Sequence, residues 1–269
     1  MSSAALQVVN LQAGYDQTQV LRGVNLHAMP GEAIVLLGRN GSGRRTMLQA
    51  ISGNTTDTCS GSVRIIGRES LHEISPDIGH LGLHQQPFES HVIPDFTCEE
   101  NLLLPTSPQH DFGGGLSLTR IYQLCPVLQQ QQHRPASELN PGTRRLLALA
   151  RLLRTGANLI LVNEFASSLC ATSLEAFITL ANNLKCMGYT LILAESSVAA
   201  CSRFASRYYV LDNGHVIDAF AAGALPGRRN WLDAFLHSEK SASPAMAAHA
   251  SPGNSQSVVV SLGAPPKPR

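Results

Sequence analysis

A glycine-rich loop, GRNGSGRRT at residues 38–46, limits the folds that are open to this chain. Loops that cradle nucleotide phosphates read G-x-x-x-x-G-K-[ST], because the glycines let backbone N–H groups approach the anion and the lysine reaches its terminal phosphates. Gly38 and Gly43 stand at this spacing. Arg44 then occupies the lysine position, and Arg45 occupies the position of the hydroxyl that binds the metal. The loop predicts a phosphate-binding turn in which these two positions have changed.

The segments on both sides of the loop have the pattern that such a turn requires. AIVLLG (33–38) is an apolar run typical of a buried strand, and TMLQAISG (46–53) predicts a helix that ends at glycine. NLILV (158–162) and TLILA (190–194) predict further buried strands, with a helical stretch at 173–187 between them. Strands that alternate with helices predict a largely parallel sheet with crossover helices.

Four other regions complete the predicted architecture. Residues 7–26 predict two strands, and YYVLDNGHVI (208–217) predicts a hairpin because Asp-Asn-Gly separates two apolar runs. Short helical segments at 89–143 predict an inserted helical subdomain. Residues 238–269 are rich in Ser, Ala and Pro and contain no aromatic residue, so we expect a disordered tail.

Composition narrows the class of protein. With 269 residues and 43% hydrophobic content, the chain can bury a large core. Its net charge of +1 implies no general attraction to nucleic acid. We expect no signal peptide and no membrane span. Since the six cysteines form no C-x-x-C pair, we expect reduced, mostly buried thiols, and we assign no residue as a metal ligand.

The order of two motifs that follow the loop indicates the kind of protein. LNPGTRR (139–145) precedes a helix, and that helix precedes NLILVNE (158–164). This order resembles the ATP-binding cassette subunit of an ABC transporter, in which an L-S-G-G-Q-type signature precedes a strand that ends in Asp-Glu. The resemblance covers about residues 6–236. It implies an α/β fold of the P-loop NTPase, ABC-cassette type, with a mixed sheet core, an N-terminal antiparallel β region and an inserted helical subdomain, in a cassette domain at 1–237.

Finer details are similar to the subunits of branched-chain amino acid and urea importers. They are LLGRNGSG (36–43), IPDFTCEENLLL (93–104) and YQLCPVLQQQQHRPASELNPG (122–142). The resemblance implies an importer cassette that binds ATP and contacts membrane permease subunits and a second ATP-binding subunit. It also implies a dimer, at the cytoplasmic face of the inner membrane.

The resemblance assigns roles to individual residues. Glu164 stands where a glutamate polarises the attacking water, Asn163 where an aspartate holds the metal's water shell, and Ser196 near the family's switch histidine. The residues implied to bind ATP are the adenine-stacking aromatic and the loop: Tyr15, Gly38, Arg39, Asn40, Gly41, Ser42, Gly43, Arg44, Arg45 and Thr46. The signature positions are Leu139, Asn140, Pro141, Gly142 and Thr143.

Several of these positions depart from the family pattern. Arg45 lacks the magnesium-binding hydroxyl, Asn163 is neutral, and Pro141 has no N–H to donate. One interpretation is decay of the site. The other is compensation, in which an added guanidinium and a lost carboxylate replace part of the cation's charge and make nucleotide binding less dependent on Mg²⁺. Tyr15 either stacks on adenine or is a partly buried core tyrosine.

The family's Q-loop glutamine is ambiguous, because a gapless comparison places Phe88 there, with Gln85 and Gln86 nearby. Since phosphoryl transfer depends on positioning and charge stabilisation, we expect hydrolysis to be weak or absent. Two functions stay open. One is a divergent transporter cassette, and the other is a catalytically dead pseudo-ATPase that regulates or scaffolds.

Overall fold

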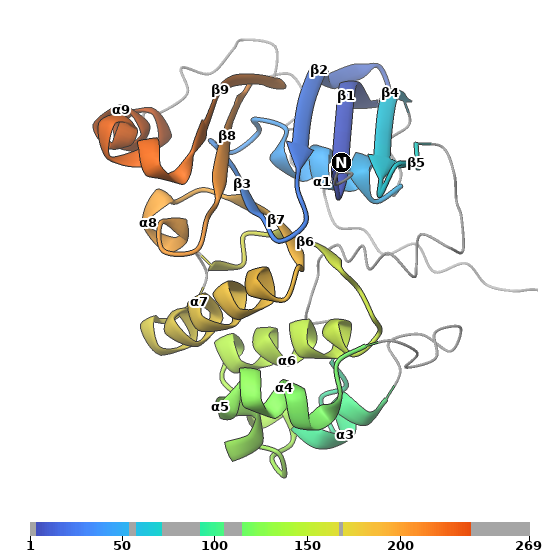
Figure 1. The fold of residues 1–269 in the computed structure, drawn as a ribbon, viewed down its shortest axis with the longest axis vertical. Helices are drawn as coiled ribbons and strands as arrows, with labels where there is room; N and C mark the ends of the chain where they lie inside the picture. The colour runs from blue at the N-terminus through green and yellow to red at the C-terminus, as the bar shows by residue number, and fades with distance from the viewer. Residues whose placement is uncertain (1–3, 54–57, 72–91, 105–114, 167–168, 238–269) are drawn as a thin grey trace, which may run out of the picture. The chain divides into compact units, whose positions relative to one another are not determined.

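The computed structural model describes residues 4–53, 58–71, 92–104, 115–166 and 169–237, and the N-terminal part forms an antiparallel sheet (Figure 1). The strand order is β2-β1-β4-β5. The strands are β1 (Leu6–Tyr15), β2 (Thr18–Ala28), β4 (Thr58–Ile65) and β5 (Arg68–Glu69). Both strands predicted within residues 7–26 are therefore confirmed. The predicted tail at 238–269 lies outside the described residues.

A second sheet has the strand order β6-β7-β3-β8-β9. Its strands are β3 (Ala33–Gly38), β6 (Leu159–Asn163), β7 (Thr190–Glu195), β8 (Arg207–Asp212) and β9 (His215–Ala221). The β3, β6, β7 and β8 pairings are parallel, and β9 returns antiparallel to β8 with Asp212 paired to His215. The predicted hairpin, the mixed sheet and the antiparallel N-terminal region are confirmed.

The central strand β3 is buried on both faces, which explains its unbroken apolar run. Ala33, Val35 and Leu37 face one hydrophobic cluster, which also contains residues of α6 and α7. Ile34 and Leu36 face the other cluster, which is shared with the antiparallel sheet and α1. Because side chains alternate along a strand, a continuous apolar run is what a strand covered on both sides requires.

Helices cover the parallel sheet, and α3 to α6 gather in the green part of Figure 1. The helices are α1 (Arg44–Ile51), α3 (Cys98–Leu103), α4 (Leu118–Leu124), α5 (Pro126–Gln130), α6 (Pro141–Leu153), α7 (Ala171–Cys186), α8 (Val198–Cys201) and α9 (Leu225–His237). Helix α6 contacts α3, α5 and α7. Within the described ranges, no helix combines the length and apolarity that a bilayer crossing needs.

Two helices begin earlier than their apolar periodicity suggests. Helix α6 starts at Pro141, inside the LNPGTRR motif that was expected to precede it, because proline suits the first helical position and Asn140 caps the first turn. Helix α1 starts at Arg44 rather than at Thr46. Both starts place predicted site residues inside the first turn of a helix.

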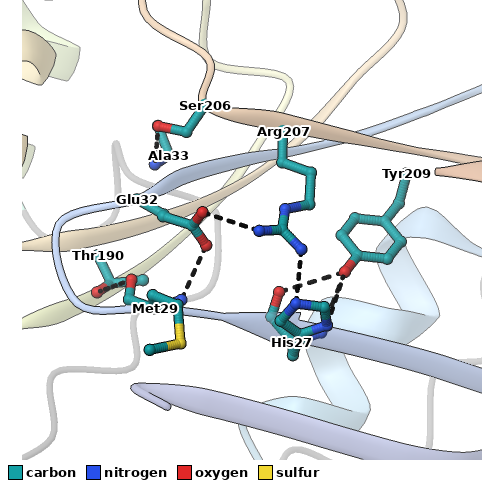
Figure 2. Close-up of polar contacts among 8 residues, drawn as sticks. All are labelled: His27, Met29, Glu32, Ala33, Thr190, Ser206, Arg207 and Tyr209. Atoms are coloured by element: carbon teal, nitrogen blue, oxygen red, sulfur yellow. Dashed lines mark hydrogen bonds and ion pairs between the residues drawn. The ribbon is translucent and has the colours of Figure 1, made fainter. Parts of the chain in front are cut away.

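A polar network joins the two sheets near the start of β3 (Figure 2). Arg207 of β8 donates to Glu32 Oε1 at 3.1 Å, and its other nitrogen lies 2.6 Å from Nε2 of His27 in β2. Glu32 Oε2 accepts from the Met29 N–H at 2.9 Å, and the Tyr209 hydroxyl lies 3.3 Å from His27 Nδ1. The network fixes the β2–β3 connection at one end of β3. The glycine-rich loop, residues 38–46, lies at the other end.

Candidate functional site

The loop after β3 leads directly into the first turn of α1. Gly43 is the N-cap residue and has a φ of 102°, a left-handed conformation that residues with a side chain rarely adopt. In this fully described helix, no side chain caps the first turn and no acidic residue stands in it. Because the first N–H groups of a helix carry partial positive charge, this end of α1 suits an anion.

A pocket of about 430 Å³ lies beside the loop. It is lined by Val20 of β2, by residues 40–46, and by Asn163 and Glu164 at the end of β6. The sheet explains this meeting, because β3 and β6 both run parallel to β7 and end at the same edge. The structure therefore brings together most of the loop and the Asn-Glu pair, which are far apart in sequence.

Arg44 is the buried charged group of this pocket, with 5% of its surface exposed. Its Nη2 lies 3.5 Å from Glu164 Oε1 and 3.5 Å from Asn40 Oδ1, long distances for hydrogen bonds. Burial lowers the pKa of the Arg44 guanidinium, and the carboxylates of Glu164 and Glu195 oppose that lowering. Since an arginine starts from so high a pKa, the group stays charged.

Two buried polar atoms of residues that line the pocket have no hydrogen-bond partner among the described residues. They are Nη1 of Arg44 and Oγ of Ser42, whose residue is 1% exposed. Buried donors are nearly always satisfied in folded proteins, so both atoms remain able to donate to a ligand with acceptor atoms, such as the oxygens of a phosphate group.

Two positions that bind Mg²⁺ in the family pattern have other side chains in this pocket. Arg45 is exposed and lines it, Thr46 is buried, and Asn163 supplies an amide in place of a carboxylate. In the described part of the chain, no three His, Cys, Asp or Glu side chains come together as a metal site. Magnesium prefers carboxylate, phosphate and water oxygens, and two guanidinium groups in the same pocket repel it.

Hydrogen bonds to its backbone hold Glu164 at the end of β6. Its φ is 48°, in the left-handed region that is uncommon for glutamate. Its N–H donates to the Ala194 carbonyl at 2.7 Å, and Nη1 of Arg145 in α6 donates to its carbonyl at 3.2 Å. Sequence reasoning missed this link, because it assigned no role to Arg145 at the end of the LNPGTRR motif, and it missed Val20, which lies in no motif.

The predicted signature residues form the start of α6, and the described lining of the pocket contains none of them. Asn140 Oδ1 accepts from the Thr143 N–H at 2.8 Å, and Pro141 is the first helical residue. The guanidinium of Arg144 donates to the carbonyls of Ala136, Ser137 and Leu139 at 3.1 to 3.2 Å. The segment before α6 is therefore tied to the helix.

Other predicted residues lie beside the pocket or elsewhere. The described lining does not contain Tyr15, Gly38 or Arg39. The Tyr15 hydroxyl donates to Gln49 of α1. Arg39 pairs with Asp212 Oδ1 at 3.0 Å and lies 4.7 Å from the centre of the Phe235 ring.

The residues after β7 also have defined places. Ser196 is exposed. Glu195 is fully buried and accepts from the Ala166 N–H at 2.7 Å, so it holds the connection after β6. The candidates for the Q-loop glutamine, Gln85, Gln86 and Phe88, lie outside the described residues.

A model of the ABC transporter family matches residues 21–167, which is more than half of the 269-residue chain. The chain belongs to the ABC transporter family. It is an ATP-binding cassette subunit, and its pocket lies within and just beside the matched region.

Relatives of this ABC cassette serve different transport systems. BraG of Pseudomonas aeruginosa, a high-affinity branched-chain amino acid transport ATP-binding protein, is 27% identical over 82% of this chain and 95% of BraG. LolD of Psychrobacter arcticus, a lipoprotein-releasing system ATP-binding protein, is 30% identical over 79% of this chain and 98% of LolD. These relatives establish the family to which the chain belongs. They do not establish which substrate is transported, because their names refer to different transport systems.

Solved ABC cassettes share the fold. The ADP conformation of the cassette MJ1267 has a TM-score of 0.69 at 19% identity and covers 88% of this chain and 100% of its own. A nucleotide-free cassette has a TM-score of 0.67 at 20% identity and covers 81% of this chain and 92% of its own. At this identity the likeness concerns the fold alone.

Proposed function

We propose that this chain is the ATP-binding subunit of an importer-type ABC transporter of the branched-chain amino acid and urea kind. It binds ATP, couples to membrane permease subunits and hydrolyses ATP weakly or not at all. The observation that carries the proposal is the pocket in which loop residues 40–46 meet Asn163 and Glu164. The similarity to BraG over 95% of that protein's length supports the subfamily.

The arrangement proposed for the chain follows from the resemblance to the family. Residues 1–237 form the cassette, with a helical subdomain at about 89–143, and the Ser-, Ala- and Pro-rich residues 238–269 follow it in the sequence. The cassette pairs with a second ATP-binding subunit and contacts permease subunits on the cytoplasmic face of the inner membrane. Tyr15 and the loop, including Gly38 and Arg39, form the nucleotide side, and residues 139–143 face the partner's nucleotide.

Weak hydrolysis is proposed because several groups that stabilise the transferred phosphoryl have changed. Asn163 and Arg45 replace the two magnesium contacts, and Pro141 removes an N–H from the signature. Glu164 keeps its carboxylate, but its Oε1 lies 3.5 Å from Arg44 Nη2, so it shares its charge with a guanidinium.

A pseudo-ATPase that regulates or scaffolds is the second candidate. The pairing of Glu164 with Arg44 favours it, because the two groups partly satisfy each other without a nucleotide. In this candidate the cassette fold serves as an interaction surface.

Thermal unfolding of the full chain with and without ATP separates the two candidates. A ligand at about 100 times its Kd stabilises by about 2.7 kcal/mol, which is a shift of roughly 5–10 °C for a domain of this size. A shift of this size supports the ATP-binding subunit. No shift at millimolar ATP contradicts it and favours the scaffold.

Hydrolysis is measured in parallel, with Glu164→Gln as the control for a contaminating ATPase. We expect turnover far below about one per second, at the low end of enzyme rates. A rate of about one per second in the native chain that disappears in Glu164→Gln would contradict weak hydrolysis.

A further inference from the structure

The pocket has two positive side chains where the family pattern uses a metal. Arg44 and Arg45 line it, Glu164 is the carboxylate in its described lining, and Asn163 is neutral. The lining therefore carries one net positive formal charge. The family pattern of one lysine, one aspartate and one glutamate carries one net negative charge, and it becomes positive only with Mg²⁺ bound. The side chains of this pocket therefore carry a net charge of +1 without a cation. The family pattern carries this net charge only when Mg²⁺ is bound.

Unsatisfied donors in the same pocket point to an oxyanion. Ser42 Oγ and Arg44 Nη1 are buried and have no partner among the described residues. The first turn of α1 adds N–H groups that no side chain in the described chain caps. Guanidinium and N–H donors bind phosphate oxygens through charge-assisted hydrogen bonds, so these groups match a polyphosphate.

The same groups oppose a divalent cation. A cation in the pocket would meet the Arg45 guanidinium and the Asn163 amide where carboxylate and hydroxyl oxygens are needed. Glu164, the carboxylate of the lining, already has Arg44 within 3.5 Å. To bind Glu164, a cation would have to draw its carboxylate away from the buried guanidinium of Arg44. Arg44 would then lose part of the electrostatic stabilisation that this partner provides.

We propose that this pocket binds the polyphosphate of a nucleoside triphosphate without a divalent cation, with Arg45 supplying the positive charge that the metal supplies in the family pattern. The proposal rests on the function proposed above, because it concerns the same site. Arg44 and the loop N–H groups hold the phosphates beside the buried end of the pocket. Arg45, which is exposed, neutralises the part of the polyphosphate nearer to solvent.

The test is calorimetric titration of the full chain with ATP, once in EDTA and once with Mg²⁺. We expect the two values of Kd to agree within about threefold, a difference well under the 1.4 kcal/mol of a tenfold change. Arg45→Ser should raise Kd in EDTA by about tenfold, the effect of losing one charge-assisted contact. Arg68→Ser removes the same charge from the exposed strand β5 and should leave Kd unchanged.

A double variant tests the converse. Arg45→Ser with Asn163→Asp restores the family's two metal contacts and should bind ATP at least about tenfold more tightly with Mg²⁺ than in EDTA.

If the native chain binds ATP about tenfold more tightly with Mg²⁺ than in EDTA, the inference is wrong, but the proposed ATP-binding function still stands. The same conclusion follows if Arg45→Ser and the native chain bind ATP equally well in EDTA. No binding under either condition would overturn the proposed function together with the inference. The comparison of native chain in the two buffers needs no variant, so poor folding of a variant cannot hide the answer.

Discussion

We predict that Gly142→Ala destabilises the protein, although alanine is the best helix former. Gly142 is the second residue of α6, and a Cβ added there would lie 2.2 Å from Ser173 Oγ and 2.5 Å from Ser173 Cβ in α7. The Ser173 hydroxyl can rotate away. Its Cβ is fixed to the backbone of α7, so α6 and α7 must move apart to admit the methyl group.

The magnitude follows from two opposing effects. Overpacking at a tight contact costs about 1–3 kcal/mol, and replacing glycine inside a helix returns about 0.5–1 kcal/mol. The midpoints of these two ranges leave a net loss of about 1.2 kcal/mol, which lowers the thermal midpoint by about 2–5 °C for a domain of this size. Thermal unfolding followed by circular dichroism measures it.

Gly227→Ala in α9 is the matched control, because a Cβ there meets no atom within 4 Å. It should stabilise by about 0.5–1 kcal/mol, so the same substitution changes sign between two helices. Ser173→Gly removes both clashing atoms and should cancel most of the loss caused by Gly142→Ala in a double-mutant cycle. Two results would contradict this reasoning. One is a Gly142→Ala variant that is as stable as the native protein. The other is a loss of stability on Gly142→Ala that is equally large when Ser173→Gly is present.

Two further predictions concern helix starts. Asn140→Ala removes the side-chain oxygen that accepts from the Thr143 N–H at 2.8 Å and should cost about 1 kcal/mol, seen as a lower urea midpoint; an unchanged midpoint would argue against this cap. The pKa of Glu100 lies below its usual value because its carboxylate accepts from the backbone N–H and the hydroxyl of Thr97. A lowered pKa stabilises the fold above the ordinary glutamate pKa, and this contribution is lost as the pH falls through the lowered value. Glu100→Gln should therefore weaken the fall of the unfolding midpoint between about pH 5 and 3, and an equal fall in both proteins would contradict this.

Strands could be predicted from sequence because a strand that is buried on both faces has an unbroken run of apolar residues. The apolar runs at 33–38 and 190–194 correspond to β3 and β7, which are buried along their whole lengths. Helix starts were predicted less well, since cap residues lie outside the apolar periodicity. Gly43 and Asn140 set the starts of α1 and α6 through backbone conformation and one side-chain bond.

The candidate site was partly predictable for a similar reason. The spacing of the loop and the Asn-Glu pair at a strand end indicated which residues would meet, and the sheet order β6-β7-β3 brings them to one pocket. The partners of individual guanidinium groups were not predictable. Arg39 turns to Asp212 and Arg44 to Glu164 because of side-chain conformations and neighbours that no local pattern encodes.

The hairpin of β8 and β9 is bonded to the glycine-rich loop. Besides the ion pair between Arg39 and Asp212, the Gly214 N–H donates to the Ser42 carbonyl at 3.0 Å. A loop that is already hydrogen-bonded loses little conformational entropy when an anion enters it. Arrival of the anion is then governed by diffusion and charge rather than by folding of the loop, and substitutions in the pocket act mainly on how long the anion stays.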